Sequence, residues 1–427
     1  MAHLRVAASR LVARFARPLL WGFFALVVAV LFYRYLYKDG DFDIYWAGTF
    51  RFLHALQIHV QEIHPFSYPT FATFLLLPLY PLGYSAAKVV FFVLNVIILV
   101  AALRVCHREI LDGSRYRVAA IAITLVFSVR SMLAVFNNQQ SDILIFGLIV
   151  FGLSACCRRP IGGMGLVAVA AALKANPLFM LLLPLFKKQW RMAIAFLLFT
   201  TSLVLLPDVL KYAVTDSWHE ASFSVPGSVI AAEETVPVGN FKAMKHSAGA
   251  FSYLHEHFVL NLSPDPAVNR WWQSRENHFN QSLYRIIASR LGERVPANYV
   301  LIGLCAVFAV LLGVLTRRRA DRFFILGMLY YSAFVLIGPQ SSKPHFIAFY
   351  GLLLFCWQDA FERRSMLKFL VLAAVSGLMG IKYAAWLIPD EAVARDIVGL
   401  AGFGLWLYSY VVLAVRGTRT RVRTAEP

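Results

Sequence analysis

The chain has 427 residues, of which 59% are hydrophobic and only 15% are charged, whereas a soluble globular protein carries roughly a quarter charged residues. Its 41 Lys and Arg against 23 Asp and Glu give a net charge of +18. Apolar runs of about 17–25 residues, long enough to cross a bilayer, recur along the chain. The composition excludes a soluble globular enzyme and indicates a polytopic membrane protein.

The positive charge lies in short clusters beside the apolar runs. Loops on the cytoplasmic side of a membrane carry such an excess of Lys and Arg, which also attracts anionic membrane lipids. We therefore expect no nucleic-acid binding, and we assign every basic cluster to the cytoplasm. The clusters occupy residues 107–117, 156–160, 187–191, 317–322, 362–364 and 416–423.

The N-terminal 18 residues contain four arginines and precede an apolar run that ends at Tyr37. This run is longer than the apolar core of a signal peptide, which has about 7–15 residues. We expect a cytoplasmic N-terminus over residues 1–18 and a retained first span over about 19–37.

A first outer loop is predicted to follow over residues 38–85. It contains an amphipathic helix near 44–57 and an interfacial segment at 68–83, where three prolines favour dipping into the membrane over crossing it. Its first residues hold Asp39, Asp41 and Asp43 within five positions. A solvated turn broken by Gly40 is the simple interpretation of these acids, and a chemical role is the alternative.

The remaining apolar runs predict an all-α bundle of about twelve transmembrane helices with both termini inside. Between Arg159 and Lys187 the basic ends and the central "KANP" indicate a hairpin of two short helices with Lys174 near its outward tip. Residues 19–415 form one integral membrane domain, with a second outer loop at 207–298 and a cytoplasmic tail at 416–427. The other spans are expected at about 86–106, 117–135, 142–157, 192–206, 299–316, 323–338, 345–360, 367–386 and 397–415.

With the basic loops inside, the unusual polar clusters all fall on the outer face. They are the aspartates at 39–43, "NNQQSD" at 137–142, Lys174, the loop at 207–298, and "PQSSKPH" at 339–345. Ionisable groups close to membrane depth are costly and are functional candidates. The outer face is therefore the predicted working face.

Neither ATP nor nucleotide sugars occur on that side, so a reaction there draws its energy from the substrate. A sugar linked to a lipid phosphate is such a donor. Its transfer needs a carboxylate as general base for the acceptor hydroxyl, worth about 10²–10⁴-fold. The leaving phosphate needs positive charge and hydrogen-bond donors. A carboxylate after the first span, with Lys174, Lys343 and His345 at other span ends, would supply both.

Six motifs occur in an order that resembles glycosyltransferase family 87. The resemblance covers about residues 38–360 and implies a membrane enzyme of the GT-C class, with a polyprenyl-phosphate-linked sugar as donor. The motifs are "DFDIYWAG", "FSYPTFATFLLLPL", "NNQQSDILIFGLI", "AAALKANPLFMLLLPLFKKQWR", "NQSLYRIIASRL" and "IGPQSSKPHFIAFY".

The family pattern of an Asp shortly before a Tyr matches Asp41 with Tyr45 and implies Asp41 as the base, a role that the neighbouring Asp43 could also take. Where the family has Tyr-Pro-Pro this chain has Tyr68-Pro69-Thr70, and where it has Trp and two His this chain has only His345. The catalytic candidates are thus Asp41, Asp43 and His345, and the phosphate-binding candidates are Lys174, Arg285 and Lys343. The sugar- or acceptor-binding candidates are Tyr45, Tyr68, Asn137, Asn138, Gln139, Gln140, Asn280 and Gln340.

Some of these candidate residues also have a purely structural interpretation. The amide row could be an outer turn in which Ser141 or Asp142 caps the next helix, and Lys174 could be a snorkelling lysine. The five cysteines lie in or beside apolar runs and lack metal-ligand spacing, so neither a disulfide framework nor a metal is expected.

We expect inverting transfer of a sugar, mannose or another hexose or pentose, to a lipid-linked or cell-envelope glycan acceptor. The location would be the outer face of a bacterial cytoplasmic membrane, with no cofactor. A lipid transporter or flippase is the alternative from another class. It predicts internal repeats and polar residues reaching the spans from both faces, whereas the sequence shows no repeat and one-sided polar clusters.

Overall fold

The computed structural model describes residues 26–53, 60–61, 68–215, 242–243, 280–292, 295, 297–319, 321–338, 341–380 and 391–415. Within these ranges the fold is helical except for one antiparallel pair of two-residue strands, β1 (Val60–Gln61) and β2 (Lys242–Ala243). The predicted all-α class is therefore confirmed. The two terminal segments at 1–18 and 416–427 and most of the predicted loop at 207–298 lie outside the described residues.

Five of the described helices are long enough and apolar enough to cross a bilayer. They are α3 (Tyr84–Leu111), α4 (Arg117–Asn138), α8 (Trp190–Thr215), α12 (Ala297–Arg318) and α17 (Glu391–Val415). Each contains one of the predicted spans, because a chain in lipid must satisfy its backbone hydrogen bonds within a helix. One boundary was wrong: α8 continues through Pro207 to Thr215, into the segment predicted as outer loop.

The other predicted spans are shorter helices. A helix of 14 or 15 residues is about 21–23 Å long, against a hydrocarbon core of about 30 Å. The count of twelve crossings is therefore not confirmed and stays a prediction. The shorter elements are the helix Leu26–Tyr37, α5 (Asp142–Cys156), α6 (Pro160–Leu173), α7 (Leu182–Phe186), α13 (Phe323–Ile337), α14 (Tyr350–Arg363) and α15 (Met366–Gly380).

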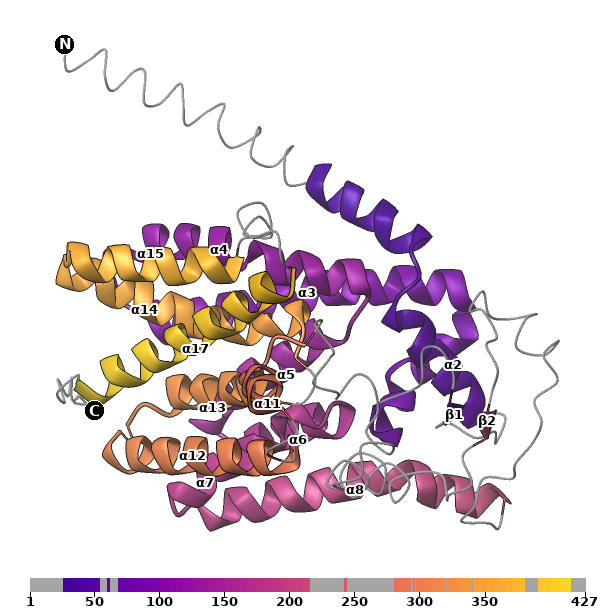
Figure 1. The fold of residues 1–427 in the computed structure, drawn as a ribbon. Coiled ribbons are helices and arrows are strands. Elements are labelled where there is room, and N and C mark those ends of the chain that lie inside the picture. Colours follow the sequence, from indigo (N-terminus) through magenta and orange to yellow (C-terminus); the bar gives the residue numbers. More distant parts are fainter. Residues whose placement is uncertain are drawn as a thin grey trace, which may run out of the picture.

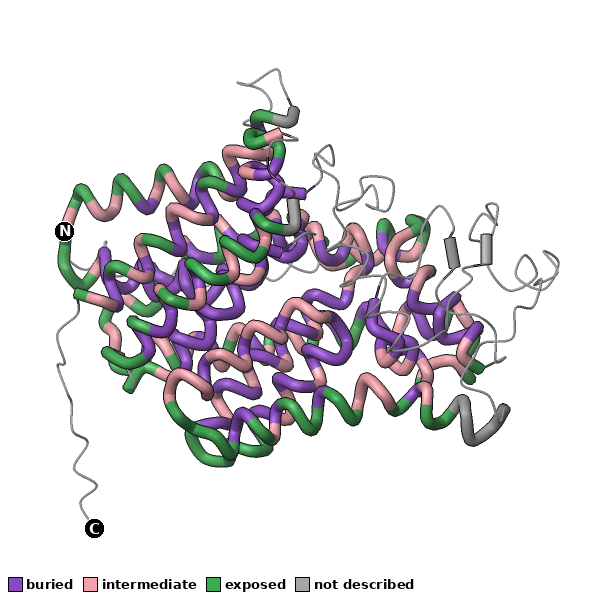
Figure 2. Tube along the Cα trace, turned by 60° about the horizontal axis from the view of Figure 1, so that its bottom comes forward, coloured by how far each residue is buried: buried purple, intermediate pink, exposed green. Residues whose placement is uncertain are grey.

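The bundle is packed around α13 and α14, whose residues are buried along almost their whole length. The α5–α6 pair approaches closely at Gly152 and Gly163, where an added Cβ would lie 2.6–2.7 Å from backbone atoms of the opposite helix. Small residues permit this kind of contact between membrane helices. Figure 2 shows the buried positions inside the bundle and exposed positions on its outer helices, where Leu198 and Val310 are 64% and 65% exposed.

Short helices complete the fold near the site. These are α2 (Asp41–Leu53), η1 (Thr70–Leu75), η2 (Leu77–Leu82), η3 (Asn176–Leu181), α11 (Leu283–Leu291) and η7 (Lys343–Phe349). The predicted hairpin has its break where expected, since α6 ends at Leu173 and η3 begins at Asn176, with Lys174 between them.

Figure 1 shows α2 at one end of the bundle and the turns that join α7 to α8, α12 to α13 and α14 to α15 at the other end. These three turns carry basic residues, among them Lys188, Arg319 and Arg364. The charge pattern predicts that these two ends face opposite sides of the membrane.

Candidate active site

Asp41 is the first residue of α2 and is held by Tyr68. The Tyr68 hydroxyl donates a hydrogen bond to Oδ2 of Asp41 at 2.5 Å. A hydrogen bond from Thr49 Oγ1 to the carbonyl of Thr73, 2.6 Å long, fastens α2 to η1 and so brings Tyr68 beside Asp41. The ring of Tyr45, one turn further along α2, packs on Tyr68 with centroids 4.7 Å apart. Asp41 is half-buried.

The pKa of Asp41 is raised above its ordinary value, chiefly because burial disfavours the charged carboxylate. The Tyr68 hydrogen bond, the positive charge of Lys174 and a hydrogen bond from Gln140 act in the opposite direction, and burial outweighs them. A raised pKa makes Asp41 a stronger base than an exposed aspartate.

Lys174 and Asp142 form a buried ion pair beside Asp41. Nζ of Lys174 donates to both carboxylate oxygens of Asp142, at 3.0 and 2.9 Å, and the two side chains are 11% and 2% exposed. Lys174 follows the C-terminus of α6 and Asp142 begins α5, so each charge lies at the helix end that favours it. Nζ also lies 5.9 Å from the ring centroid of Tyr68. Tyr68 is therefore the contact between the carboxylate of Asp41 and the lysine.

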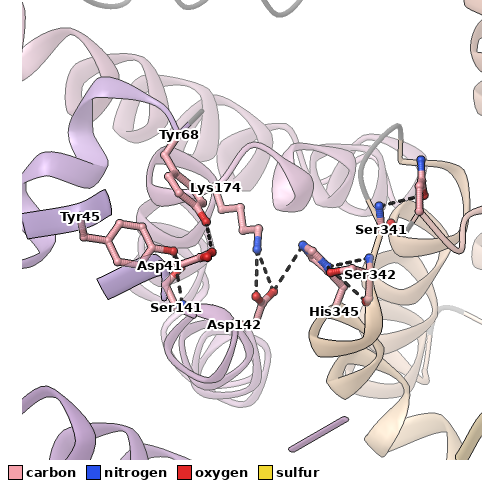
Figure 3. A network of polar contacts seen from close by, with 10 residues as sticks. Asp41, Tyr45, Tyr68, Ser141, Asp142, Lys174, Ser341, Ser342 and His345 are labelled. Carbon is pink, nitrogen blue, oxygen red and sulfur yellow. Dashed lines mark hydrogen bonds and ion pairs between the residues drawn. The ribbon is translucent and has the colours of Figure 1, made fainter. Parts of the chain in front are cut away.

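His345 approaches the ion pair of Lys174 and Asp142 from the side opposite to Asp41 (Figure 3). The backbone N–H of Ser342 donates to Nδ1 of His345 at 3.0 Å. In the tautomer that accepts this bond, the neutral imidazole carries its proton on Nε2. Nε2 lies 3.9 Å from Oδ1 of Asp142. Three segments far apart in the sequence thus place a second carboxylate, an ammonium and an imidazole around the buried carboxylate of Asp142.

The loop before η7 is held by α11. Oδ1 of Asn280 accepts hydrogen bonds from the backbone N–H groups of Ser282, at 3.0 Å, and Ser341, at 3.1 Å. Arg285 donates from Nε to the Asn280 carbonyl at 3.0 Å and pairs with Asp396 of α17. The structure therefore places Asn280 and Arg285 in a group that supports the His345 loop, and it pairs Arg285 with Asp396 rather than with Asp142.

Asp43 points into a different group from Asp41. One carboxylate oxygen accepts the Gly40 N–H at 2.9 Å, which satisfies a backbone donor at the start of α2. The other accepts a hydrogen bond from the Tyr84 hydroxyl and lies 3.6 Å from Nζ of Lys88. Asp43 is 4% exposed. These contacts fasten α2 to α3 and leave Asp41 as the aspartate next to Lys174 and Asp142.

We expect Asp43→Ala to lower the free energy of unfolding by about 3–5 kcal/mol, because Lys88 would keep its buried charge without a carboxylate. The folded fraction should retain its turnover number. Thermal unfolding in detergent and activity per folded molecule measure the two effects, with the exposed Asp39→Ala as control. A stable Asp43→Ala protein without turnover would instead make Asp43 the base.

The two glutamines of the amide row differ in role, since Gln139 holds the backbone in place and Gln140 lies beside Asp41. Gln139 ends α4 with a positive φ of 55°, and its Nε2 donates to the carbonyls of Tyr35 and Lys38 at 2.7 and 2.5 Å. Gln140 instead hydrogen-bonds Asp41, and its Oε1 is buried without a hydrogen-bond partner in the described structure. Gln140 therefore has acceptor capacity left for a ligand hydroxyl.

The other predicted residues are placed as follows. Asn137 and Asn138 are half-buried in the last turn of α4. Tyr45 shares a 2.9 Å hydrogen bond with Ser141. Lys343 begins η7 and is half-buried, and Gln340 lies outside the described residues.

Sequence reasoning did not select Asp142, Ser342 or Asp396 as functional, and it did not consider Lys88 at all. Asp142 was considered as the last residue of the polar cluster at 137–142 and as a helix cap, and its two partners are 32 and 203 positions away. Lys88 carries a signal that could have been used, because it is an ionisable residue at the start of an apolar span.

The arrangement offers two carboxylates, one ammonium and one imidazole at a shared site. Across the described ranges, no three His, Cys, Asp or Glu side chains are grouped as metal ligands would be. A half-buried carboxylate that can act as a base lies next to buried groups that can donate hydrogen bonds to a phosphate. This arrangement suits the transfer of a group from a phosphate to a hydroxyl.

A comparison with protein-family models gives one match, to glycosyltransferase family 87, over residues 66–339. A search of the curated proteins and a search of the solved structures gave no match. The matched region covers more than half of the chain and contains Tyr68, Asp142 and Lys174, whereas Asp41 and His345 lie outside it. The chain therefore belongs to glycosyltransferase family 87 and is a membrane glycosyltransferase.

Proposed function

We propose that this enzyme transfers a sugar from a polyprenyl-phosphate donor to a lipid-linked or cell-envelope glycan acceptor. The reaction would take place at the outer face of a bacterial cytoplasmic membrane, in a GT-C-type bundle of about twelve crossings. The observation that carries the proposal is the position of Tyr68, whose hydroxyl binds Asp41 and whose ring lies 5.9 Å from Nζ of Lys174. The proposed base and the proposed phosphate-binding cation thus lie on two sides of one side chain.

In the proposed reaction, the acceptor hydroxyl oxygen attacks C1 of the sugar and its proton passes to the Asp41 carboxylate. The bond between C1 and the phosphate oxygen breaks, and the electron pair leaves with the polyprenyl phosphate. Attack from the side opposite the leaving group inverts C1. Lys174 and the Nε2–H of His345 stabilise the charge that grows on the phosphate. Lys343, two residues before His345, is a further phosphate-binding candidate.

Sugar hydroxyls are assigned to the groups around Asp41. Tyr45, Tyr68 and Gln140 all lie within one or two contacts of that carboxylate. Aromatic rings pack on the apolar faces of sugars, and an amide both donates and accepts hydrogen bonds. Asn137 and Asn138 extend this polar surface along the end of α4.

The test is a transfer assay with the purified protein in detergent, radiolabelled polyprenyl-phosphate-mannose and an envelope lipid extract. We expect the label to move into a new lipid or glycan product. Detergent removes the two compartments that a transporter needs, so product formation cannot come from transport. If the label stays on the polyprenyl phosphate with mannose and with a panel of other hexose and pentose donors, the proposed donor class is wrong.

The raised pKa of Asp41 predicts the acid limb of the pH profile. A general base must be ionised, and burial favours its protonated form, so kcat/KM should fall as pH drops through a pKa above the ordinary Asp value of about 3.9. Tyr68→Phe removes a hydrogen bond that favours the ionised carboxylate. We therefore expect this variant to move the limb to higher pH, measured as kcat/KM against pH. If the acid limb of kcat/KM does not move in Tyr68→Phe, Asp41 is not the group whose protonation lowers the activity.

A further inference from the structure

Asp142 is the most buried charge of the site, and the proposed reaction gives it no chemical step. Its side chain is 2% exposed, and both of its oxygens face cations or donors that we assign to the donor phosphate. A phosphate site would be expected to keep its positive charge available for the anion. Here the positive charge of Lys174 is balanced by a carboxylate at 2.9 Å.

The charge balance matters because the two phosphates of the reaction differ in charge. The donor is a phosphodiester with one negative charge, whereas the released polyprenyl phosphate is a monoester, which carries about 1.5–2 negative charges near pH 7. A site with unbalanced positive charge binds the product more tightly than the donor, and product release then limits turnover. A nearby carboxylate acts against the dianion more strongly than against the monoanion.

We propose that Asp142 is a specificity-determining residue that makes the phosphate site prefer the donor phosphodiester over the product phosphomonoester. This inference rests on the proposed function. Lys174 keeps one of its three N–H groups for the phosphate, since two are bound to Asp142. The Asp142 carboxylate keeps the net charge of the pair at zero, so the donor gains a directed hydrogen bond, while the second negative charge of the product gains no net attraction.

A purely structural role for Asp142 predicts a different result. Loss of a structural anchor would loosen Lys174 and His345 and weaken the binding of both phosphates. The charge-balancing role predicts the opposite sign for Asp142→Asn. The amide has nearly the same shape, its oxygen can still accept from Lys174, and the negative charge is gone.

The experiment compares wild type and Asp142→Asn, both as full-length protein in detergent at pH 8, where a phosphomonoester is a dianion. The probes are polyprenyl phosphate and its methyl phosphodiester, and the readout is the dissociation constant of each. We expect Asp142→Asn to bind the diester about 10-fold more tightly and the monoester about 100-fold more tightly, since the charge interaction doubles with ligand charge. Polyprenyl phosphate should become a correspondingly stronger product inhibitor.

Asp359→Asn is the matched control. Asp359 is also a fully buried carboxylate between two cations, Arg363 at 2.9 Å and Lys368 at 2.8 Å, but it lies near the opposite end of α14 from η7. Its amide variant should leave both dissociation constants unchanged. Equal or weaker binding of the monoester by Asp142→Asn would overturn the inference.

A measurement on the wild type covers the case in which Asp142→Asn does not fold. The balanced site should bind the methyl diester at least as tightly as the monoester at pH 8, whereas a preference for the dianion would contradict it. The proposed function fails separately, namely if the wild type transfers no sugar from any polyprenyl-phosphate donor.

Discussion

Asp41→Asn is expected to lower kcat by about 10²–10⁴-fold, the range that general-base help supplies. The amide cannot take the proton of the acceptor hydroxyl, yet it keeps the size of the carboxylate and can accept the hydrogen bond from Tyr68. Folding and donor binding should therefore survive. Single-turnover transfer of radiolabelled sugar measures the loss, and the dissociation constant of the donor shows that binding is retained.

Asp39→Asn is the control for this change. Asp39 is two residues away and exposed, so removing its charge tests whether any acid at the start of the loop affects transfer. We expect its turnover to stay within about twofold of wild type, as surface substitutions away from special features usually have small effects. Equal loss of turnover in both variants would argue against Asp41 as the base.

Lys174→Met should produce the second large effect, on binding and on stability together. The variant loses the cation assigned to the donor phosphate, and a hydrogen bond to a charged group contributes about 1.5–3 kcal/mol. This corresponds to a rise of about 10–100-fold in the donor dissociation constant. The substitution also leaves Asp142 buried without its main partner, which costs about 3–5 kcal/mol of stability.

The double variant Lys174→Met/Asp142→Asn separates these two effects. Stability should recover because no buried charge is left unpaired, but the double variant should bind the donor more weakly than Asp142→Asn alone because the cation is still absent. Thermal unfolding and donor binding, measured on the same four proteins, form a double-mutant cycle. Equal donor affinity of the double variant and Asp142→Asn would show that Lys174 does not bind the phosphate.

The positions of the helices were largely predictable from the sequence. The expected spans at 117–135 and 323–338 became α4 (Arg117–Asn138) and α13 (Phe323–Ile337). Long apolar runs without charges leave the chain few alternatives to a helix. The error at α8 is local: the predicted span ended at residue 206, before Pro207, but the helix continues through this proline.

The two aspartates show what a better local prediction would have achieved. The amphipathic helix was expected near 44–57, whereas α2 already begins at Asp41. Residues two apart on a helix point about 200° away from each other. Had the helix been predicted to begin three residues earlier, at Asp41, the two aspartates would have been expected to face different elements, as they do in the structure.

The contacts of the site could not be predicted from the sequence. Asp142 meets Lys174 and His345 only because α5, α6 and η7 pack in one particular way. No periodicity or spacing encodes such a long-range contact. The same holds for Arg285, which was predicted at the phosphate and instead lies against Asp396 of α17.

The proposed donor depends on the site facing outward, where nucleotide sugars are absent, and thiol labelling tests this most directly. Cys157 is exposed and follows the end of α5 opposite to Asp142, and Asp39→Cys adds an exposed thiol beside the site. A membrane-impermeant maleimide applied to right-side-out vesicles should label residue 39 and spare Cys157. Labelling of Cys157 with protection of residue 39 would place the site in the cytoplasm and contradict a lipid-phosphate sugar taken up at the outer face.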